Sequence, residues 1–273
     1  MNATVWILLV VIGLPFVVFF ISLVIFGSPS PREPRFIKAL RFNMFAETLG
    51  LFGYVLRNPR LLSFRATEAE KKMPIPGDEL IPAANASATY AITIDACAEN
   101  IWPWLVQMGY GRALWYAWSP PHAFPEYKHH INPATLHPGW QNLKRGDVLL
   151  DEDALDQCSE NKGAWWVMEI QEQRASVFFS ARDFIRGIEF DPQKTRPRQI
   201  YGITSWVFYI HPVTGEKSRL IIRTRAEIGP GMLKIIDHLL FGCMDAAFER
   251  TILEGIIYRV EQHANTSKPA ALR

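Results

Sequence analysis

The first 31 residues contain no Asp, Glu, Lys or Arg, and this uncharged run constrains the fold more than any other feature of the chain. Residues Thr4 to Phe26, about 23 in number, are almost wholly Val, Ile, Leu and Phe. As a helix with about 1.5 Å rise per residue they would extend roughly 34 Å, enough to cross a hydrocarbon core of about 30 Å. We therefore predict a transmembrane anchor within residues 1–28, bent at Pro15 because proline removes a helical hydrogen bond.

A cleaved signal peptide is the alternative interpretation of this run. It is disfavoured because no basic residue precedes the apolar stretch, the stretch is long, and Phe26-Gly27-Ser28 is a poor cleavage site. Charge then predicts the orientation, since four basic residues follow the helix, namely Arg32, Arg35, Lys38 and Arg41. We expect a single-pass protein of the cell inner membrane with its C-terminal domain in the cytoplasm.

Residues 29–75 are expected to form a juxtamembrane amphipathic helix and a linker. Apolar residues recur at helical spacing from Phe36 to Leu56, so this helix either lies on the lipid surface or packs on the soluble domain. Residues 36–56 would also provide the contact surface for a membrane-protein partner. The charged stretch Glu68 to Lys72 and the segment Met73 to Asp78 are interpreted as linker and turn.

The main domain is expected at residues 76–264, followed by a disordered tail at 265–273. Thr89 to Ile94 has a strand pattern, and Ala98 to Met108 a helical one in which Pro103 predicts a first-turn position or a break. A β pattern follows, and a long helix is expected from Met232 to about His263. The later strands are predicted at Asp147–Leu150, Ala164–Gln171, Ser176–Ala181, Gly202–His211 and Arg219–Ala226. This element order predicts an α+β fold.

Composition excludes several classes of function. A net charge of +2 with no basic stripe argues against a nucleic-acid partner. No nucleotide-binding or nucleophile-elbow fingerprint occurs, so no cofactor is expected. His122, His129, His130 and His137 are clustered, but they lack metal-ligand spacing on a defined element, so no metal site is predicted.

Several local motifs resemble the START-like superfamily, also called SRPBCC or helix-grip proteins, which includes polyketide cyclases and lipid-transfer domains. The resemblance covers roughly residues 76–263. It is carried by Pro76-Gly-Asp78, Tyr90-Ala-Ile-Thr-Ile94, Ile101-Trp-Pro-Trp-Leu-Val-Gln-Met-Gly109, Gly111-Arg112, Trp115-Tyr116, Gly146-Asp147 and Leu220-Ile-Ile-Arg-Thr-Arg225. It implies a curved antiparallel sheet wrapped around a long C-terminal helix, with an apolar cavity between them.

The predicted ligand-binding residues follow from this fold and from strand alternation. Alternation sends half of the strand aromatics toward the helix, where they line a pocket or serve as plain core. Arg223 and Arg225 share a strand face, which either lies exposed on the outside or meets the cavity and binds an anionic head group. The resemblance adds polar groups at the pocket entrance, of which Gln107 alternatively satisfies backbone groups at the helix end. The full set is Trp104, Gln107, Arg112, Tyr116, Trp166, Phe179, Trp206, Phe208, Arg223 and Arg225.

Three functional hypotheses remain open. The first is a membrane-anchored domain that binds an apolar or amphipathic molecule, such as a lipid or isoprenoid-like compound, taken from the bilayer. The second is a cyclase or dehydrase-like enzyme in which Tyr116, Asp147 or an arginine polarises a hydrophobic carbonyl substrate, although Asp147 after Gly146 is most simply a turn residue. The third is a scaffold subunit of a membrane complex.

Overall fold

The computed structural model describes residues 64–109, 111–116, 133–150, 164–183, 186, 188–198, 201–229 and 242–267. The predicted anchor, the helix expected between Phe36 and Leu56 and residues 268–273 of the predicted tail all lie outside these ranges, whereas residues 265–267 of that tail belong to the C-terminal helix. Within the described part, no helix is long and apolar enough to cross a membrane.

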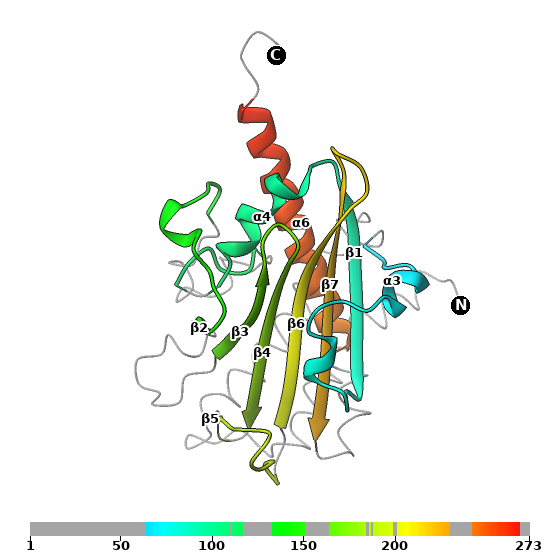
Figure 1. Ribbon diagram of the computed structural model, residues 1–273, viewed down its shortest axis with the longest axis vertical. Helices are drawn as coiled ribbons and strands as arrows, with labels where there is room; N and C mark the ends of the chain where they lie inside the picture. The colour runs from blue at the N-terminus through cyan, green and yellow to red at the C-terminus, as the bar shows by residue number, and fades with distance from the viewer. Residues whose placement is uncertain are drawn as a thin grey trace, which may run out of the picture.

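A seven-stranded antiparallel sheet forms the centre of the fold (Figure 1). Its strand order is β1-β7-β6-β4-β3-β2, and the short β5 pairs with β4. The strands are β1 Ala86–Ile94, β2 Val148–Leu150, β3 Ala164–Gln171, β4 Ala175–Asp183, β5 Ile188–Glu189, β6 Tyr201–Pro212 and β7 Ser218–Gly229. Each strand predicted from the sequence is confirmed, with bounds that differ by a few residues.

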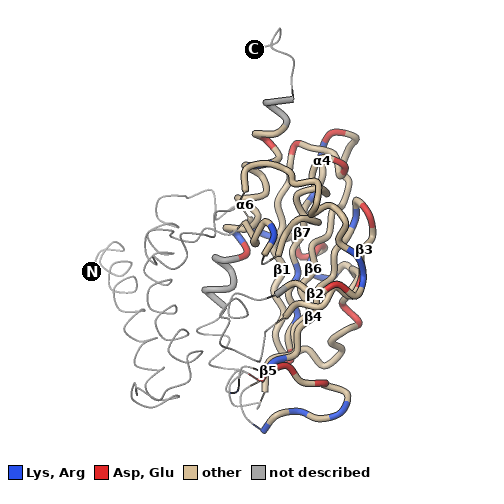
Figure 2. The backbone as a smooth tube through the Cα atoms, turned by 90° about the vertical axis from the view of Figure 1, so that its left-hand side faces the viewer, with Lys and Arg blue, Asp and Glu red and all other residues tan. Residues whose placement is uncertain are grey.

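Two longer helices cover one face of the sheet. They are α4, Ala98–Val106, and α6, Gly242–Ser267, and Figure 2 shows α6 on one side of the strands. Apolar residues of α6 recur at helical spacing on the buried side, as Ile252, Leu253, Ile256 and Val260. The predicted α+β class is thus confirmed, and a large antiparallel sheet with a C-terminal helix is compatible with a helix-grip architecture.

Helix α4 continues through Pro103, so the prediction of a break or a first-turn position there is wrong. An interior proline costs about 3 kcal/mol or more because it removes a hydrogen bond and crowds the preceding turn. The flanking Trp102 and Trp104 are buried. Burial of two indoles contributes a similar amount, which explains why so short a helix tolerates the proline.

The other face of the sheet is covered by residues 65–81, which we call the N-terminal strap. It contains helix α3, Glu68–Lys72, and the 3₁₀ helix η2, Asp78–Leu80. The sequence pattern of this stretch predicts a linker, but Thr67 and Glu70 form a reciprocal capping box that stabilises α3. Ala66 and Ile75 are buried against this face, so packing of the described part begins before the expected boundary at residue 76.

Candidate functional site

Aromatic rings form a continuous cluster on the helix-facing side of the sheet. Trp206 and Phe208 alternate along β6, and their ring centroids are 4.9 Å apart. The Trp206 ring also lies 4.8 Å from that of Trp115 and 5.2 Å from that of Trp165 on β3. Phe178 of β4 is the register partner of Trp206 and completes the group. The cluster therefore joins three strands and the segment after α4.

The rings of this cluster pack edge to face or at a tilt rather than face to face. Trp115 meets Phe178 edge to face, and Phe178 meets Phe208 in the same way. Trp206 and Phe208 are 4% and 0% exposed, whereas Trp165 is only partly buried. Such a cluster is held together by apolar contact area and by dispersion between its rings.

A carboxylate outside the predicted ligand-binding set faces the same side of the sheet. Glu249 of α6 is 2% exposed and accepts a hydrogen bond from Oγ1 of Thr224, 3.2 Å away. Thr224 is the register partner of Trp206, so the carboxylate lies beside the aromatic cluster. One signal for it exists in the sequence, because Glu249 falls on the same helical stripe as Ile252, Leu253 and Ile256.

Gln107, at the end of α4, is fully buried and uses its side chain to hold another segment in place. Its amide nitrogen donates to the Tyr116 hydroxyl at 2.6 Å and to the carbonyl oxygen of Thr135 at 3.4 Å. Its oxygen accepts from the backbone N–H of His137 at 3.0 Å and from Gln141 Nε2 at 3.2 Å. These contacts occupy all the donors and acceptors of one amide, so Gln107 serves the backbone near the helix end.

Arg112 has a related role. Its guanidinium donates to the carbonyl oxygens of Val106 and Trp140, which ties the helix end to the 3₁₀ helix η4, Pro138–Trp140. Burial lowers the pKa of Arg112, and the nearby charge of Asp147 opposes that shift. Arg112 thus has a structural role, because it links the end of α4 to η4.

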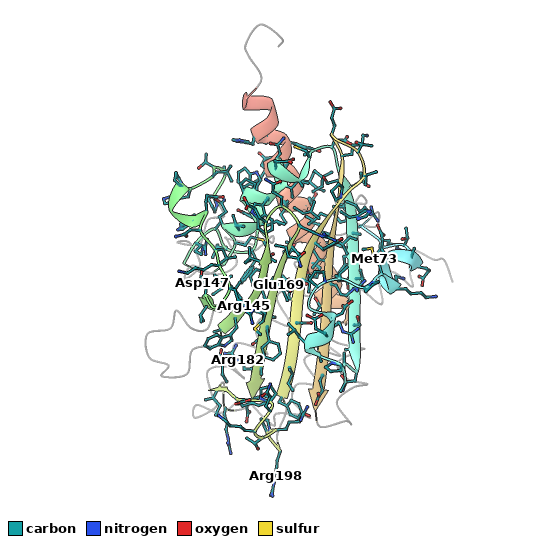
Figure 3. All side chains as sticks on the ribbon, in the orientation of Figure 1. Met73, Arg145, Asp147, Glu169, Arg182 and Arg198 are labelled. Carbon is teal, nitrogen blue, oxygen red and sulfur yellow. The ribbon has the colours of Figure 1, made fainter. Side chains whose placement is uncertain are left out.

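Asp147 is a turn residue, as its position after Gly146 predicted. Its Oδ2 accepts a hydrogen bond from the backbone N–H of Lys144 at 3.0 Å, and Gly146 has the left-handed φ of 90°. Figure 3 shows Asp147 beside β2 at one edge of the sheet, and Met73, a contact of Arg223, beside the opposite edge. Asp147 and Arg223 therefore do not form one site.

Tyr116 is a buried titratable group that directly follows Trp115 of the aromatic cluster in the chain. It is 2% exposed, and desolvation raises the pKa of its phenol well above the ordinary value of 10.0, so the hydroxyl stays protonated at neutral pH. The guanidinium carbon of Arg259 lies 4.5 Å from its ring centroid, a cation–π contact from α6. Its φ of 59° is rare for an aromatic residue, and these contacts hold that conformation.

Trp104 is completely buried between α4 and α6. Its ring meets Tyr116 and His263 edge to face, with centroids 6.2 Å and 6.0 Å away. Within the described ranges its indole N–H has no hydrogen-bond partner. A buried N–H group without a partner would be stabilised by a hydrogen-bond acceptor on a ligand.

Two of the predicted aromatic residues lie on the wrong face of the sheet for a helix-facing pocket. Trp166 is 43% exposed, and its indole N–H donates to Glu189 Oε2 at 3.3 Å. Phe179 packs beside Ile81 on the face that the strap covers. On β3 and β4 the alternation is therefore the reverse of the predicted one. The neighbours Trp165 and Phe178 are the residues that face the helices.

The two predicted arginines are also placed on the strap-covered face. Arg223 is 3% exposed and donates to Asp78 Oδ2 at 2.6 Å, to Thr89 Oγ1 and to the carbonyl oxygens of Met73, Glu70 and Lys71. Arg225 donates to the carbonyl oxygen of Ile81 at 3.2 Å. Because this face is not the helix-facing one, the alternative of a head-group site on Arg223 and Arg225 is overturned. Arg223 also differs from the expected exposed arginine, since it is buried beneath the strap.

Within the parts of the chain that the structure describes, no group of His, Cys, Asp and Glu residues is arranged to hold a metal ion. His137 stacks on Trp140 with centroids 4.3 Å apart. The other three histidines of the predicted cluster lie outside the described residues.

No family model matches the sequence, and no curated protein matches it. A protein from Nitrosospira multiformis is 11% identical with a TM-score of 0.37, covering 66% of this chain and 99% of its own. A conserved protein from Geobacillus kaustophilus is 13% identical with a TM-score of 0.34, covering 65% and 96%. Truncated norcoclaurine synthase from Thalictrum flavum is 12% identical with a TM-score of 0.30, covering 61% and 91%. At these values no conclusion about family or function follows.

Proposed function

We propose that this chain is a membrane-anchored, START-like domain that binds an apolar or amphipathic small molecule, such as a lipid or isoprenoid-like compound, between the helix-facing side of its sheet and α6. The observation that carries the proposal is the aromatic cluster around Trp206. It gathers rings from three strands and from Trp115 on a single face. Ligand sites favour such apolar surfaces with a few polar groups, here Tyr116 and Glu249.

The proposed anchor gives the binding site a source of ligand. The uncharged run before Pro31 would keep the domain beside the bilayer, and the basic residues that follow would keep it on the cytoplasmic side. A lipid-like molecule then exchanges over a short distance.

Ligand binding is tested by native mass spectrometry of the full-length chain after gentle detergent extraction. The expected result is a bound lipid-like species at a defined stoichiometry. Trp206→Ala should lose that species, because it removes the ring at the centre of the cluster. Trp166→Ala is the matched control, since Trp166 is 43% exposed and lies on the other face of β3. A wild-type protein that carries no ligand under any extraction condition would refute the proposal.

Anchoring is tested separately by fractionating cells that express the full chain or a form without residues 1–28. The full chain should sediment with membranes and resist extraction by carbonate, and the shortened form should not. Protease added to spheroplasts should leave the C-terminal domain intact. Digestion of that domain from outside the cell would overturn the proposed orientation.

A second candidate function is a cyclase or dehydrase-like reaction on a hydrophobic carbonyl substrate. One observation favours it, namely that the phenol of Tyr116 is buried, protonated and aligned by Gln107. A protonated phenol polarises a carbonyl by hydrogen bonding. For a dehydration, wild type should carry the product that has lost water, whereas Tyr116→Phe should carry the substrate that retains it. Identical ligands in both proteins would exclude this function.

The scaffold hypothesis stays a proposal that rests on residues 36–56, which lie outside the described residues. A stoichiometric membrane-protein partner that co-purifies with the full chain, and is lost when 36–56 is replaced, would support it.

A further inference from the structure

Trp104 is a buried hydrogen-bond donor within the short helix α4. The residue is 0% exposed. Of the residues that the structure describes, none accepts a hydrogen bond from its indole Nε1. A buried donor that has lost water and gained no partner destabilises a fold, and phenylalanine would provide an aromatic ring without that cost. Packing alone therefore does not account for an indole at this position.

The rings around Trp104 are poor substitutes for the missing acceptor. Tyr116 and His263 meet the indole edge to face, and an aromatic face accepts a hydrogen bond much more weakly than a carbonyl oxygen does. By contrast, Trp166 is 43% exposed and still donates its indole N–H to Glu189. Within the described part of the chain, the fold thus pairs an indole that water could satisfy and leaves the buried one unpaired.

Trp104 belongs to the same continuous core as the aromatic cluster. Its ring contact Tyr116 directly follows Trp115, and the Trp115 ring lies 4.8 Å from that of Trp206. A lipid-sized molecule is long enough to place an apolar part on the cluster and a polar atom beside Trp104. One ligand can therefore use both features.

We infer that Trp104 donates a hydrogen bond to a neutral carbonyl oxygen, of a ketone, an ester or a quinone, on an otherwise apolar ligand held against the aromatic cluster. The inference rests on the proposed ligand-binding function and specifies the class of ligand. One neutral donor is enough for a carbonyl oxygen, whereas a buried carboxylate needs a charged partner or several donors. The cation beside Tyr116 is Arg259. It donates to the carbonyl oxygens of Pro133 and Gly255, so its donors serve the backbone and a neutral ligand group is the better match.

The experiment compares three probes that share one ring system and differ in a single group: acetylnaphthalene, ethylnaphthalene and naphthoate. Binding is measured by isothermal titration calorimetry on the full-length chain in detergent micelles, with empty micelles as the blank. Wild type should bind acetylnaphthalene about fivefold or more tightly than ethylnaphthalene, because only the ketone accepts the indole N–H. Naphthoate should bind most weakly, because its charge loses water without a charged partner.

Variants then assign the preference to Trp104. Trp104→Phe keeps an aromatic ring without the N–H, so it should bind acetylnaphthalene and ethylnaphthalene equally. Trp166→Phe is the matched control, because it makes the same change at an exposed position on the other face of β3, and it should keep the preference. If Trp104→Phe fails to fold by circular dichroism, benzothienylalanine in place of Trp104 replaces it, since this residue has nearly the same shape and carries sulfur instead of the N–H. Partition of the probes into micelles is the same for every variant, so a changed preference reports on the protein.

Equal affinities of wild type for acetylnaphthalene and ethylnaphthalene would overturn the inference and leave the binding function intact, as would a preference that persists without the N–H. Tightest binding of naphthoate would overturn the assignment to a neutral group. If no probe binds and native mass spectrometry finds a ligand, a ligand without a carbonyl oxygen overturns the inference, and one with a carbonyl that Trp104→Phe loses supports it. Absence of binding by any probe, together with no ligand in native mass spectrometry, would refute the binding function itself.

Discussion

Replacing Arg223 by Met tests how the N-terminal strap is held on the sheet. The guanidinium has five N–H donors, and the structure engages all of them: one with Thr89, and the others with Asp78 and three strap carbonyl oxygens. Met preserves the apolar stem of the side chain and removes every one of these donors. The strap would then depend on its apolar contacts, on the pair between Arg219 and Glu70 and on the hydrogen bond from Arg225 to Ile81.

The expected loss of stability is about 3 kcal/mol. Removing one partner of a buried ion pair costs about 3–5 kcal/mol, because the other charge is left uncompensated. Asp78 is 24% exposed, and the strap carbonyls lie close to solvent, so water recovers part of the loss and the lower end applies. For a domain of about 200 residues this corresponds to a fall in Tm of roughly 6–12 °C.

Urea unfolding of wild type and variant, followed by circular dichroism, measures this loss. Hydrogen exchange of residues 65–81 shows whether the strap opens before the sheet. Arg225→Met is the control, because Arg225 lies on the same face of β7 and makes one hydrogen bond to the strap, whose loss should cost about 1 kcal/mol. Equal losses for the two variants, or a loss below about 1 kcal/mol for Arg223→Met, would refute the reasoning.

The remaining predictions concern pH, a close approach and the aromatic cluster. Arg219 holds the pKa of Glu70 below its ordinary value of 4.5 through hydrogen bonds of 2.6 and 3.1 Å. Because the pKa of Glu70 is lower in the folded state, the pair stabilises the protein above about pH 4.5 and loses that effect as pH falls through the folded pKa. In urea titrations, the difference in free energy of unfolding between wild type and Glu70→Gln should therefore disappear in that pH range. Gly255→Ala should destabilise by about 1–2 kcal/mol in the same assay, because the added methyl would overlap the carbonyl oxygen of Tyr116 and that clash outweighs the gain of about 1 kcal/mol in helix propensity. Trp206→Ala should cost about 3–5 kcal/mol if the ring is pure core, and a cost below about 2 kcal/mol would identify it as the lining of a ligand space.

Regular elements were predictable because their signals are local. Alternation of apolar residues located the long strands β6 and β7, and the helical spacing of Cys243, Ala247 and Ile256 located α6. The turn at Asp147 followed from the Gly-Asp pair in the same way. The capping box at Thr67 and Glu70 is an equally local signal. Helix α3 was therefore predictable, although the charged stretch was interpreted as a linker.

The phase of alternation was not predictable in β3. Trp165 and Trp166 are adjacent and equally apolar, so the pattern alone does not distinguish the residue that faces the helices. The register with β4 shifts between Val167 and Glu169, which disturbs the alternation further along the strand. Pairing with β4 decides which residues of β3 face the helices, because it places Phe178 and Val167 together on the buried side.

By itself, the sequence determined the uncharged N-terminal run, the α+β order of elements and the positions of most strands, because hydrophobic periodicity is a property of neighbouring residues. The roles of particular side chains depended on the tertiary structure. Arg223 is a structural residue because the strap lies over it, although the two are about 150 residues apart, and Glu249 faces Thr224 only when α6 lies against β7. Burial and charge pairing arise between segments that are remote in sequence, so only the assembled fold shows which predicted side chains share a site.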